Sequence, residues 1–285
     1  MKSALSYLAS LLRDGYRRFY AHGCATMSAA VAFYSLLWLI PLALLVISIF
    51  GHVLGEQEAR CKVIDLVRGA APGSSSVVVG AIRSISGQQG HWFVTIVGLL
   101  GLLWAGMNLL GSLSAFLTQA WTGRRVRRTY LLQRLFALAA LVGAGVLFWL
   151  SVVLTSVVSS VSKNPELSQV MKGLSLPVGG LFSFGASVLV FFVLYRFLPA
   201  AKVETRAALI GAVLGGVLWH VTRRVFMLLV ANSSRYGQVY GPLAGVVIFM
   251  IWIFYTSMIL FYCAEVAAVW QDRRRWAAET PGSPR

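Results

Sequence analysis

Long stretches without a charged residue dominate the hydropathy pattern of this chain. No Lys, Arg, Asp or Glu occurs between Phe19 and Gly55, and none occurs between Ser84 and Gly123. A membrane-spanning helix needs roughly 20 consecutive apolar residues, so each window is long enough to hold one. A segment in hydrocarbon must satisfy its backbone hydrogen bonds internally, and helix is therefore the form that these runs predict.

Six such runs predict six membrane-spanning helices, over residues 28–51, 92–121, 135–161, 176–198, 207–231 and 242–270. The predicted fold class is all-α. We expect a polytopic membrane protein with a single membrane domain over residues 1–285, six transmembrane helices and additional amphipathic interfacial helices.

Two segments outside these runs have amphipathic patterns. Residues 1–22 repeat large apolar side chains at helical spacing, with basic residues on the remaining surface. This pattern is typical of a helix that lies on an anionic membrane leaflet, and the alternative is a cytoplasmic helix packed on the bundle. Residues 52–91 form a predicted outer loop, in which apolar stripes on both sides of Pro72 and Gly73 indicate short helices.

The composition excludes a soluble domain of this size. Of the 285 residues, 58% are hydrophobic and only 12% are charged. The charged share is about half that of an ordinary soluble protein, too little to cover a globular surface.

The net charge of +16 fits a membrane topology better than a nucleic-acid interface. With the N-terminus inside, the predicted inner segments hold 16 of the 25 Lys and Arg residues, and the outer segments hold seven. Cytoplasmic loops carry such a basic excess. The sequence thus predicts a bacterial inner-membrane protein with both termini cytoplasmic and a cytoplasmic tail over residues 271–285.

The expected partners follow from this topology. They are the lipid bilayer and, through the basic inner segments, anionic lipid headgroups. Nucleic acid is not expected as a partner, and the sequence leaves the oligomeric state open.

A group of basic residues lies inside the fifth predicted span. His220, Arg223 and Arg224 are three to four residues apart, so His220 shares a helical face with one or both arginines. Their place in the span predicts the outer part of the bilayer. They form a candidate outer polar site for an anionic group, and the alternative is that the arginines reach out to the lipid headgroups.

Two charged residues lie near the predicted inner membrane surface. Arg196 is near the inner end of the fourth span, and Glu265 is near the inner end of the sixth. Their similar depth predicts a structural salt bridge that would neutralise two costly charges.

The second span carries a set of polar residues that includes Asn108, Ser112 and Thr118. Hydrogen bonding between packed helices is the favoured interpretation, and a polar path through the bundle is the alternative.

Familiar catalytic and metal-binding motifs do not occur in the sequence. No phosphate-binding loop, paired-histidine zinc motif, serine-nucleophile elbow or acidic cluster is present among the nine Asp and Glu residues. We therefore expect no enzyme activity, no catalytic residue, no cofactor and no metal. Cys24, Cys61 and Cys263 have no metal-ligand spacing and are interpreted as small buried side chains.

Several short motifs occur in a recognisable order. They are AAVAFYSLLWLIP at residues 29–41, LYRFLP at 194–199, RAALIGA at 206–212, YGPLA at 240–244, and Ala264-Glu265. Over roughly residues 20–270 the chain resembles the YihY/BrkB family, once labelled ribonuclease BN. Two positions depart from the family pattern: Trp38 replaces a small polar residue, and Cys263 replaces glycine.

This resemblance implies a bacterial inner-membrane protein with six spans and a role in transport or export. The family-pattern positions that it carries over are Tyr34, Pro41, Arg196, Pro199, Tyr240, Gly241 and Glu265. The old nuclease label gains no support from the residues, because no acid cluster is present to bind a metal that activates water.

Two functions are compatible with these features. The first is a transporter or exporter of a small or lipid-linked anionic solute. The second is a non-transporting membrane protein that organises the envelope or binds lipid.

Overall fold

The structure, a computed structural model, describes residues 2–54, 91–124, 183–231 and 244–279. The predicted span 135–161, nearly all of the predicted loop 52–91, and the family-pattern positions Tyr240 and Gly241 lie outside these ranges.

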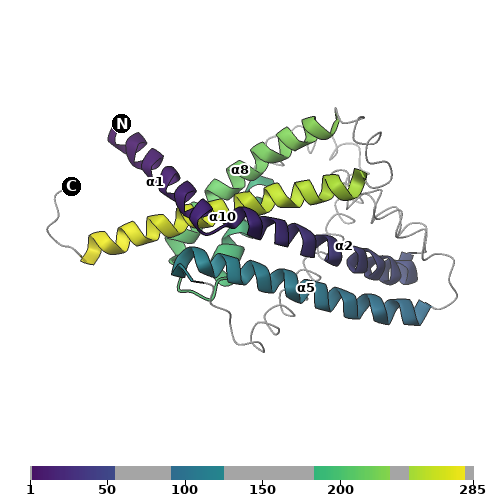
Figure 1. Ribbon diagram of the computed structural model, residues 1–285. Helices are drawn as coiled ribbons and strands as arrows, with labels where there is room; N and C mark the ends of the chain where they lie inside the picture. The colour runs from purple at the N-terminus through teal and green to yellow at the C-terminus, as the bar shows by residue number, and fades with distance from the viewer. Residues whose placement is uncertain (1, 55–90, 125–182, 232–243, 280–285) are drawn as a thin grey trace, which may run out of the picture.

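The described residues form helices, with short connections at residues 22–23 and 198–204, and no strand occurs among them. The bounds are α1 Lys2–Ala21, α2 Cys24–Leu54, α5 His91–Thr122, α8 Thr205–Ala231 and α10 Ala244–Glu279, shown in Figure 1. A shorter apolar helix, Ser183–Phe197, precedes α8. The chain is therefore an all-α protein in its described part.

Three helices are long and apolar enough to cross a membrane by themselves: Leu100–Thr122 in α5, Thr205–Leu229 in α8 and Ala244–Ala277 in α10. A fourth candidate is a bent pair, Ser6–Ala21 with Cys24–Leu39, whose two parts meet at 67°. The described residues thus support an all-α membrane protein with three spans, or four if the bent pair counts as one.

Helix α10 lies at the centre of the described bundle and contacts α1, α2, α5 and α8 (Figure 1). Small residues make this possible, because Cys263, Ala264, Ala267 and Ala268 are all fully buried on α10. A Cβ added at Gly211 of α8 would lie 3.0 Å from the Cβ of Ala267. Such close backbone approach is how membrane helices gain packing contacts.

The proline in α2 packs against a small residue in α5. Pro41 lies inside α2, and a Cβ added at Gly101 would lie 3.5 Å from its ring. One helical turn away, Gly106 accommodates the indole of Trp38. The two glycines therefore leave room on α5 for two bulky side chains of α2.

Helix α1 has two different faces. Leu11, Gly15 and Phe19 are buried, whereas Leu8 and Tyr16 of the predicted apolar stripe are more than half exposed. The buried face packs on α10, where a Cβ added at Gly15 would lie 2.5 Å from Cγ2 of Val266. Packing on the bundle and an outward apolar surface thus coexist on this helix.

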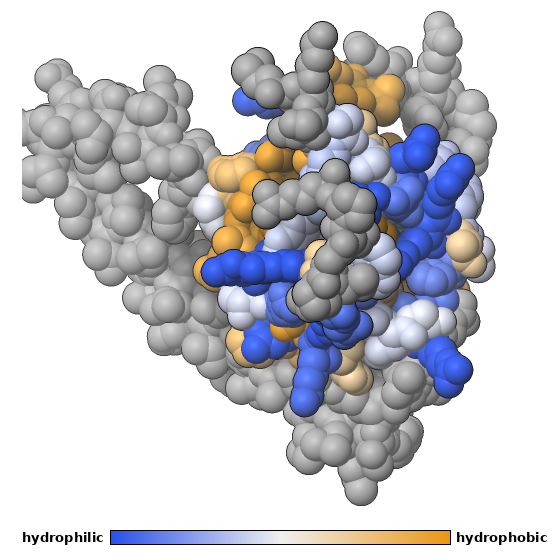
Figure 2. Space-filling model, turned by 90° about the vertical axis from the view of Figure 1, so that its left-hand side faces the viewer, coloured by the Kyte–Doolittle hydropathy of each residue, from blue (hydrophilic) through white to orange (hydrophobic). Residues whose placement is uncertain are grey.

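One end of the molecule gathers α1, the segment 198–204, the end of α5 and the last part of α10, and we call it the basic end. Figure 2 looks onto this end and shows hydrophilic side chains gathered there. The predicted cytoplasmic tail 271–285 begins inside α10, which continues to Glu279. The helix continues because its extension still packs: Gln271 is 2% exposed and accepts a hydrogen bond from the backbone N–H of Glu204 at 2.9 Å.

The contact at Gly15 generates a stability prediction. We expect Gly15→Ala to lower the free energy of unfolding by about 1–3 kcal/mol, because overpacking forces the backbone of α1 away from α10. The thermal midpoint in detergent, followed by tryptophan fluorescence, measures this loss.

Gly185→Ala is the matched control. Gly185 also lies in a helix, and a Cβ added there meets no atom of the described residues within 4 Å. Alanine there should be neutral or slightly stabilising, because it restricts the unfolded chain. Equal losses from both substitutions would contradict the close approach at Gly15.

Candidate functional site

A buried carboxylate in α10 is the centre of the candidate site. Glu265 is 1% exposed and lies among the small buried residues Cys263, Ala264, Val266 and Ala267. Charged side chains are almost never fully buried unless they are paired. A partner for Glu265 is therefore expected nearby.

The partner is His22, which lies where α1 ends and α2 has not yet begun. Gly23 adopts a left-handed backbone with φ of 66°, a conformation that glycine reaches without a steric penalty. Its N–H donates to the carbonyl of Tyr20 at 3.0 Å, and its own carbonyl accepts from Met27 N–H at 3.2 Å. This turn changes the chain direction and brings the His22 imidazole to α10.

The contact between the two side chains is short. Nδ1 of His22 and Oε1 of Glu265 lie 2.7 Å apart and share a hydrogen bond. The Cys24 thiol also donates to Oε1, at 3.8 Å. The other oxygen, Oε2, is buried and meets no hydrogen-bond partner among the residues that the structure describes. The site thus retains one unused acceptor in a nearly water-free position.

Two ion pairs join α1 to α10 beside this site. Arg18 contacts Asp272 at 2.7 Å, and Asp14 contacts Arg273. The side chains of both pairs are about one-third exposed or more. We call these two pairs the α1–α10 clasp. Exposed ion pairs each contribute little, about 0–1 kcal/mol, so the clasp positions α1 more than it stabilises the fold.

The predicted salt bridge between Arg196 and Glu265 is wrong. Arg196 instead donates to the carbonyl of Val203 at 3.1 Å, within its own connection. Its neighbour Tyr195 faces α10 and donates to the carbonyl of Leu260 at 2.9 Å. Consecutive helical residues point about 100° apart, so the face that carries Tyr195 to α10 turns Arg196 away.

The three residues of the predicted outer polar site lie along α8, away from the basic end. Nε2 of His220 lies 3.3 Å from the Ser187 hydroxyl on the preceding helix. Arg223 and Arg224 are exposed, and neither forms an ion pair with a residue in the described ranges. Their function as an anion site stays a prediction.

The polar side chains of α5 form hydrogen bonds with different parts of the structure. The amide of Asn108 donates to the Trp104 carbonyl one turn earlier at 2.8 Å, and Ser112 is half-buried. The Thr118 hydroxyl is fully buried and accepts from Ala200 N–H at 2.8 Å. Ser114 donates to the carbonyl of Leu198 at 2.8 Å. Thr118 and Ser114 thus hold the buried turn around Pro199.

The sequence reasoning missed His22 as the partner of Glu265. It also missed the two ion pairs of the clasp beside the site, Arg18 with Asp272 and Asp14 with Arg273. Local spacing could not identify them, since His22 and Glu265 are 243 residues apart. Of the other family-pattern positions, Tyr34 and Pro41 lie on α2, and Pro199 is buried. No three His, Cys, Asp or Glu side chains in the described ranges are arranged to hold a metal ion.

The comparison with protein families finds one matching family model, "Virulence factor BrkB", over residues 16–285. Curated relatives named UPF0761 membrane protein include one from Alkalilimnicola ehrlichii, 28% identical over 87% of this chain and 55% of its own length. The chain thus spans about half of that relative. One from Pseudoalteromonas translucida is 27% identical over 94% of this chain and 92% of its own length.

A third relative, from Bacillus subtilis, is named putative ribonuclease-like protein YfkH; it is 21% identical over 95% of this chain and 99% of its own length. No solved structure matches the chain.

The pair of His22 and Glu265 generates a second prediction. We expect His22→Ala to lower the free energy of unfolding by about 3 kcal/mol, because it leaves a buried carboxylate without its main partner. Denaturation in detergent micelles, followed by circular dichroism, measures the change.

The double variant His22→Ala/Glu265→Met is the matched control. It removes the buried charge together with its partner, so it should recover much of the stability lost in the single variant. A double variant as unstable as the sum of both single changes would show that the two residues are not coupled.

Proposed function

The chain belongs to the virulence factor BrkB family of membrane proteins, and from this premise we propose that it transports or exports a small or lipid-linked anionic solute across the bacterial inner membrane. The proposal rests on one observation, the buried carboxylate of Glu265 inside a helix long enough to span a bilayer. Ionisable residues in such helices are costly and typically mark ion pathways or proton relays.

The surroundings of Glu265 suit a coupling residue. Its Oε1 shares a hydrogen bond with Nδ1 of the His22 imidazole, 2.7 Å away. Its Oε2 is buried and meets no partner among the described residues, so a proton delivered there would not have to displace an existing hydrogen bond. In the proposed mechanism, protonation of Glu265 weakens its attraction to His22.

A weaker contact at His22 would loosen the α1–α2 junction. His22 lies between the two helices of the bent pair, and the α1–α10 clasp lies beside it. The side chains of these pairs are partly exposed, so breaking the pairs costs little free energy. We propose that this junction is the inner closure of the pathway, and that α1 moves with respect to α10 when Glu265 changes charge.

The proposed topology has six spans with both termini cytoplasmic. The described candidate spans overlap four of the six predicted regions, and the helix Ser183–Phe197 lies within a fifth. In this topology the basic end faces the cytoplasm, as the excess of basic inner residues favours. Its arginines would then meet anionic headgroups of the inner leaflet.

Basic groups support an anionic cargo at the opposite end. Arg223 and Arg224 are exposed on α8 and free of ion pairs within the described ranges. In the proposed topology they lie near the outer surface, where His220 adds a further polar group. They form the proposed outer vestibule for a phosphate or carboxylate.

A non-transporting role in envelope organisation or lipid binding is the second candidate. The outward surface of α1 favours it, because exposed Leu8, Tyr16 and Tyr20 accompany exposed Arg13 and Arg17. Aromatic and basic side chains of this kind anchor proteins in the headgroup region. Neither role assigns catalysis or a cofactor to the chain, and the ribonuclease-like name is that of the Bacillus subtilis relative.

The transport proposal predicts proton movement that depends on Glu265. Full-length protein is reconstituted into liposomes that contain a pH-sensitive dye, and inorganic phosphate, organic phosphate esters and carboxylates are added in turn. We expect an anion-dependent pH change that falls by roughly tenfold or more in Glu265→Gln, equivalent to a loss of at least ~1.4 kcal/mol.

Glu204→Gln is the matched control, because Glu204 is a half-exposed carboxylate at the same end, 4.0 Å from Arg275. Its signal should stay near that of the unmodified protein. Arg223→Ala and Arg224→Ala are measured beside it, and unchanged transport in both would eliminate the outer vestibule. Signals equal to those of protein-free liposomes for every anion would favour the non-transporting role.

The topology predicts the side of each loop. Green fluorescent protein should fluoresce when fused after Arg285, and alkaline phosphatase should be active when inserted near residue 60 and inactive when inserted after Arg124. Active phosphatase after Arg124 would contradict the proposed orientation.

A further inference from the structure

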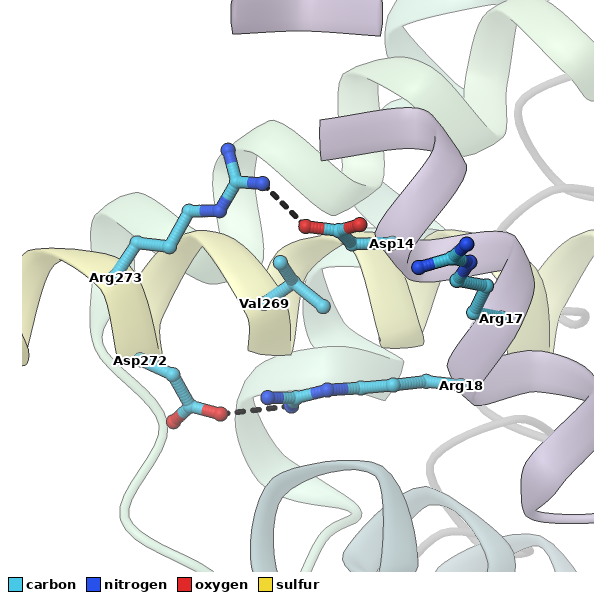
Figure 3. A pocket seen from close by; sticks show the side chains of 6 residues that line it. All are labelled: Asp14, Arg17, Arg18, Val269, Asp272 and Arg273. Carbon is cyan, nitrogen blue, oxygen red and sulfur yellow. Dashed lines mark hydrogen bonds and ion pairs between the residues drawn. The ribbon is translucent and has the colours of Figure 1, made fainter. Parts of the chain in front are cut away.

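A pocket at the basic end is not part of the site around Glu265. Its volume is about 360 Å³, within the range of small-ligand sites. It is lined by Asp14, Arg17, Arg18, Val269, Asp272 and Arg273. Figure 3 shows that α1 supplies one wall and α10 supplies the other.

The ion pairs leave one arginine of this pocket without a charged partner. Asp272 is occupied by Arg18, and Asp14 is occupied by Arg273. Arg17 forms neither an ion pair nor a hydrogen bond within the described part of the chain. With three arginines and two carboxylates, the lining has a net charge of +1, and its uncompensated charge is on Arg17.

Packing and hydrogen bonds fix several of the residues that line the pocket. Val269 is 3% exposed and packs with Leu11 of α1, so the floor is apolar and closed. The clasp lies over this floor, with one pair on each side of Val269, as Figure 3 shows. Arg273 is fixed further by a hydrogen bond to the Ser10 hydroxyl at 3.1 Å and by the Tyr7 ring, 5.4 Å from its guanidinium.

The position of the pocket also favours an anionic ligand. Exposed aromatic residues lie on the same helix, where the rings of Tyr16 and Tyr20 are in contact, with centroids 4.8 Å apart and planes tilted by 59°. Tyrosines of this kind are typical of the headgroup region of a bilayer. The pocket would then open at the depth where phosphate groups of lipids lie.

We propose that this pocket binds a phosphate group, with Arg17 as its main ligand and the clasp arginines Arg18 and Arg273 at its sides. The planar guanidinium presents two parallel N–H donors that match two phosphate oxygens. Asp14 and Asp272 hold the side arginines in place. The phosphate belongs either to an anionic lipid headgroup or to a soluble phosphate ester. The site does not depend on transport, since occupancy alone would tie α1 to α10.

Native mass spectrometry and thermal unfolding of the full chain test this site. The protein is placed in nanodiscs of phosphatidylcholine, with or without phosphatidic acid or phosphatidylglycerol, and titrated separately with inorganic phosphate. We expect the unmodified protein to bind at least one of these phosphate sources. In Arg17→Gln the affinity should be roughly tenfold lower, which corresponds to ~1.4 kcal/mol of binding free energy.

Arg13→Gln is the matched control, because Arg13 is exposed on the same helix and does not line the pocket. It should stay within about twofold of the unmodified protein, as expected for an exposed charge in a high dielectric. Arg17→Lys should retain part of the affinity for phosphate, since lysine keeps the positive charge but lacks the two parallel N–H donors of the guanidinium.

The two sources give different results. Stabilisation only in discs with anionic lipid assigns the pocket to a headgroup, and stabilisation by inorganic phosphate in phosphatidylcholine discs assigns it to a soluble ester. Equal losses in Arg17→Gln and Arg13→Gln, or no binding of either source, would overturn the proposal. Loss of phosphate binding with normal transport, or the reverse, separates this site from the transport proposal.

Discussion

The burial of Glu265 is the constraint on which the described structure depends. A carboxylate at this position in α10 would be severely destabilising without a partner. His22 meets it at 2.7 Å, and it can do so only because Gly23 turns the chain between α1 and α2. One buried charge thus determines where α1 ends, how it bends at 67° from α2, and which face of α10 it covers. The proposed coupling role uses this same dependence.

Small residues around Glu265 make the burial possible. Ala264, Ala267 and Ala268 carry only a methyl group, so neighbouring helices can come close to α10. Gly15 of α1 approaches Val266, and Gly211 of α8 approaches Ala267. Close backbone approach excludes water and lowers the local dielectric. It strengthens the contact with His22 and raises the cost of losing it. The same packing leaves the clasp and the phosphate pocket at the rim, where charged groups still reach solvent or headgroups.

The candidate site was only partly predictable from the sequence. Glu265 was identified as an unusual charge in an apolar run, and that property is local. Its partner was assigned to Arg196 because the two lie at similar depth, but depth does not specify the helical face. Tyr195 takes the face toward α10, so Arg196 turns to its own connection and binds Val203. The amphipathic pattern of residues 1–22 predicted a helix. It did not predict that Leu11, outside the apolar stripe, would be buried while Leu8 and Tyr16 of the stripe are exposed.

The sequence by itself determined the class of this protein and the existence of its apolar helices. A long run without charged residues can enter a bilayer, and in hydrocarbon its backbone must form its hydrogen bonds internally, as a helix does. Local composition is sufficient to predict this. The tertiary structure alone decided which residues meet. His22 and Glu265, or Arg18 and Asp272, are more than 240 residues apart, and contacts over such separations depend on helix order, crossing angle and rotation. Hydropathy specifies none of these, because in a membrane helix the residues that face lipid and those that face another helix are similarly apolar.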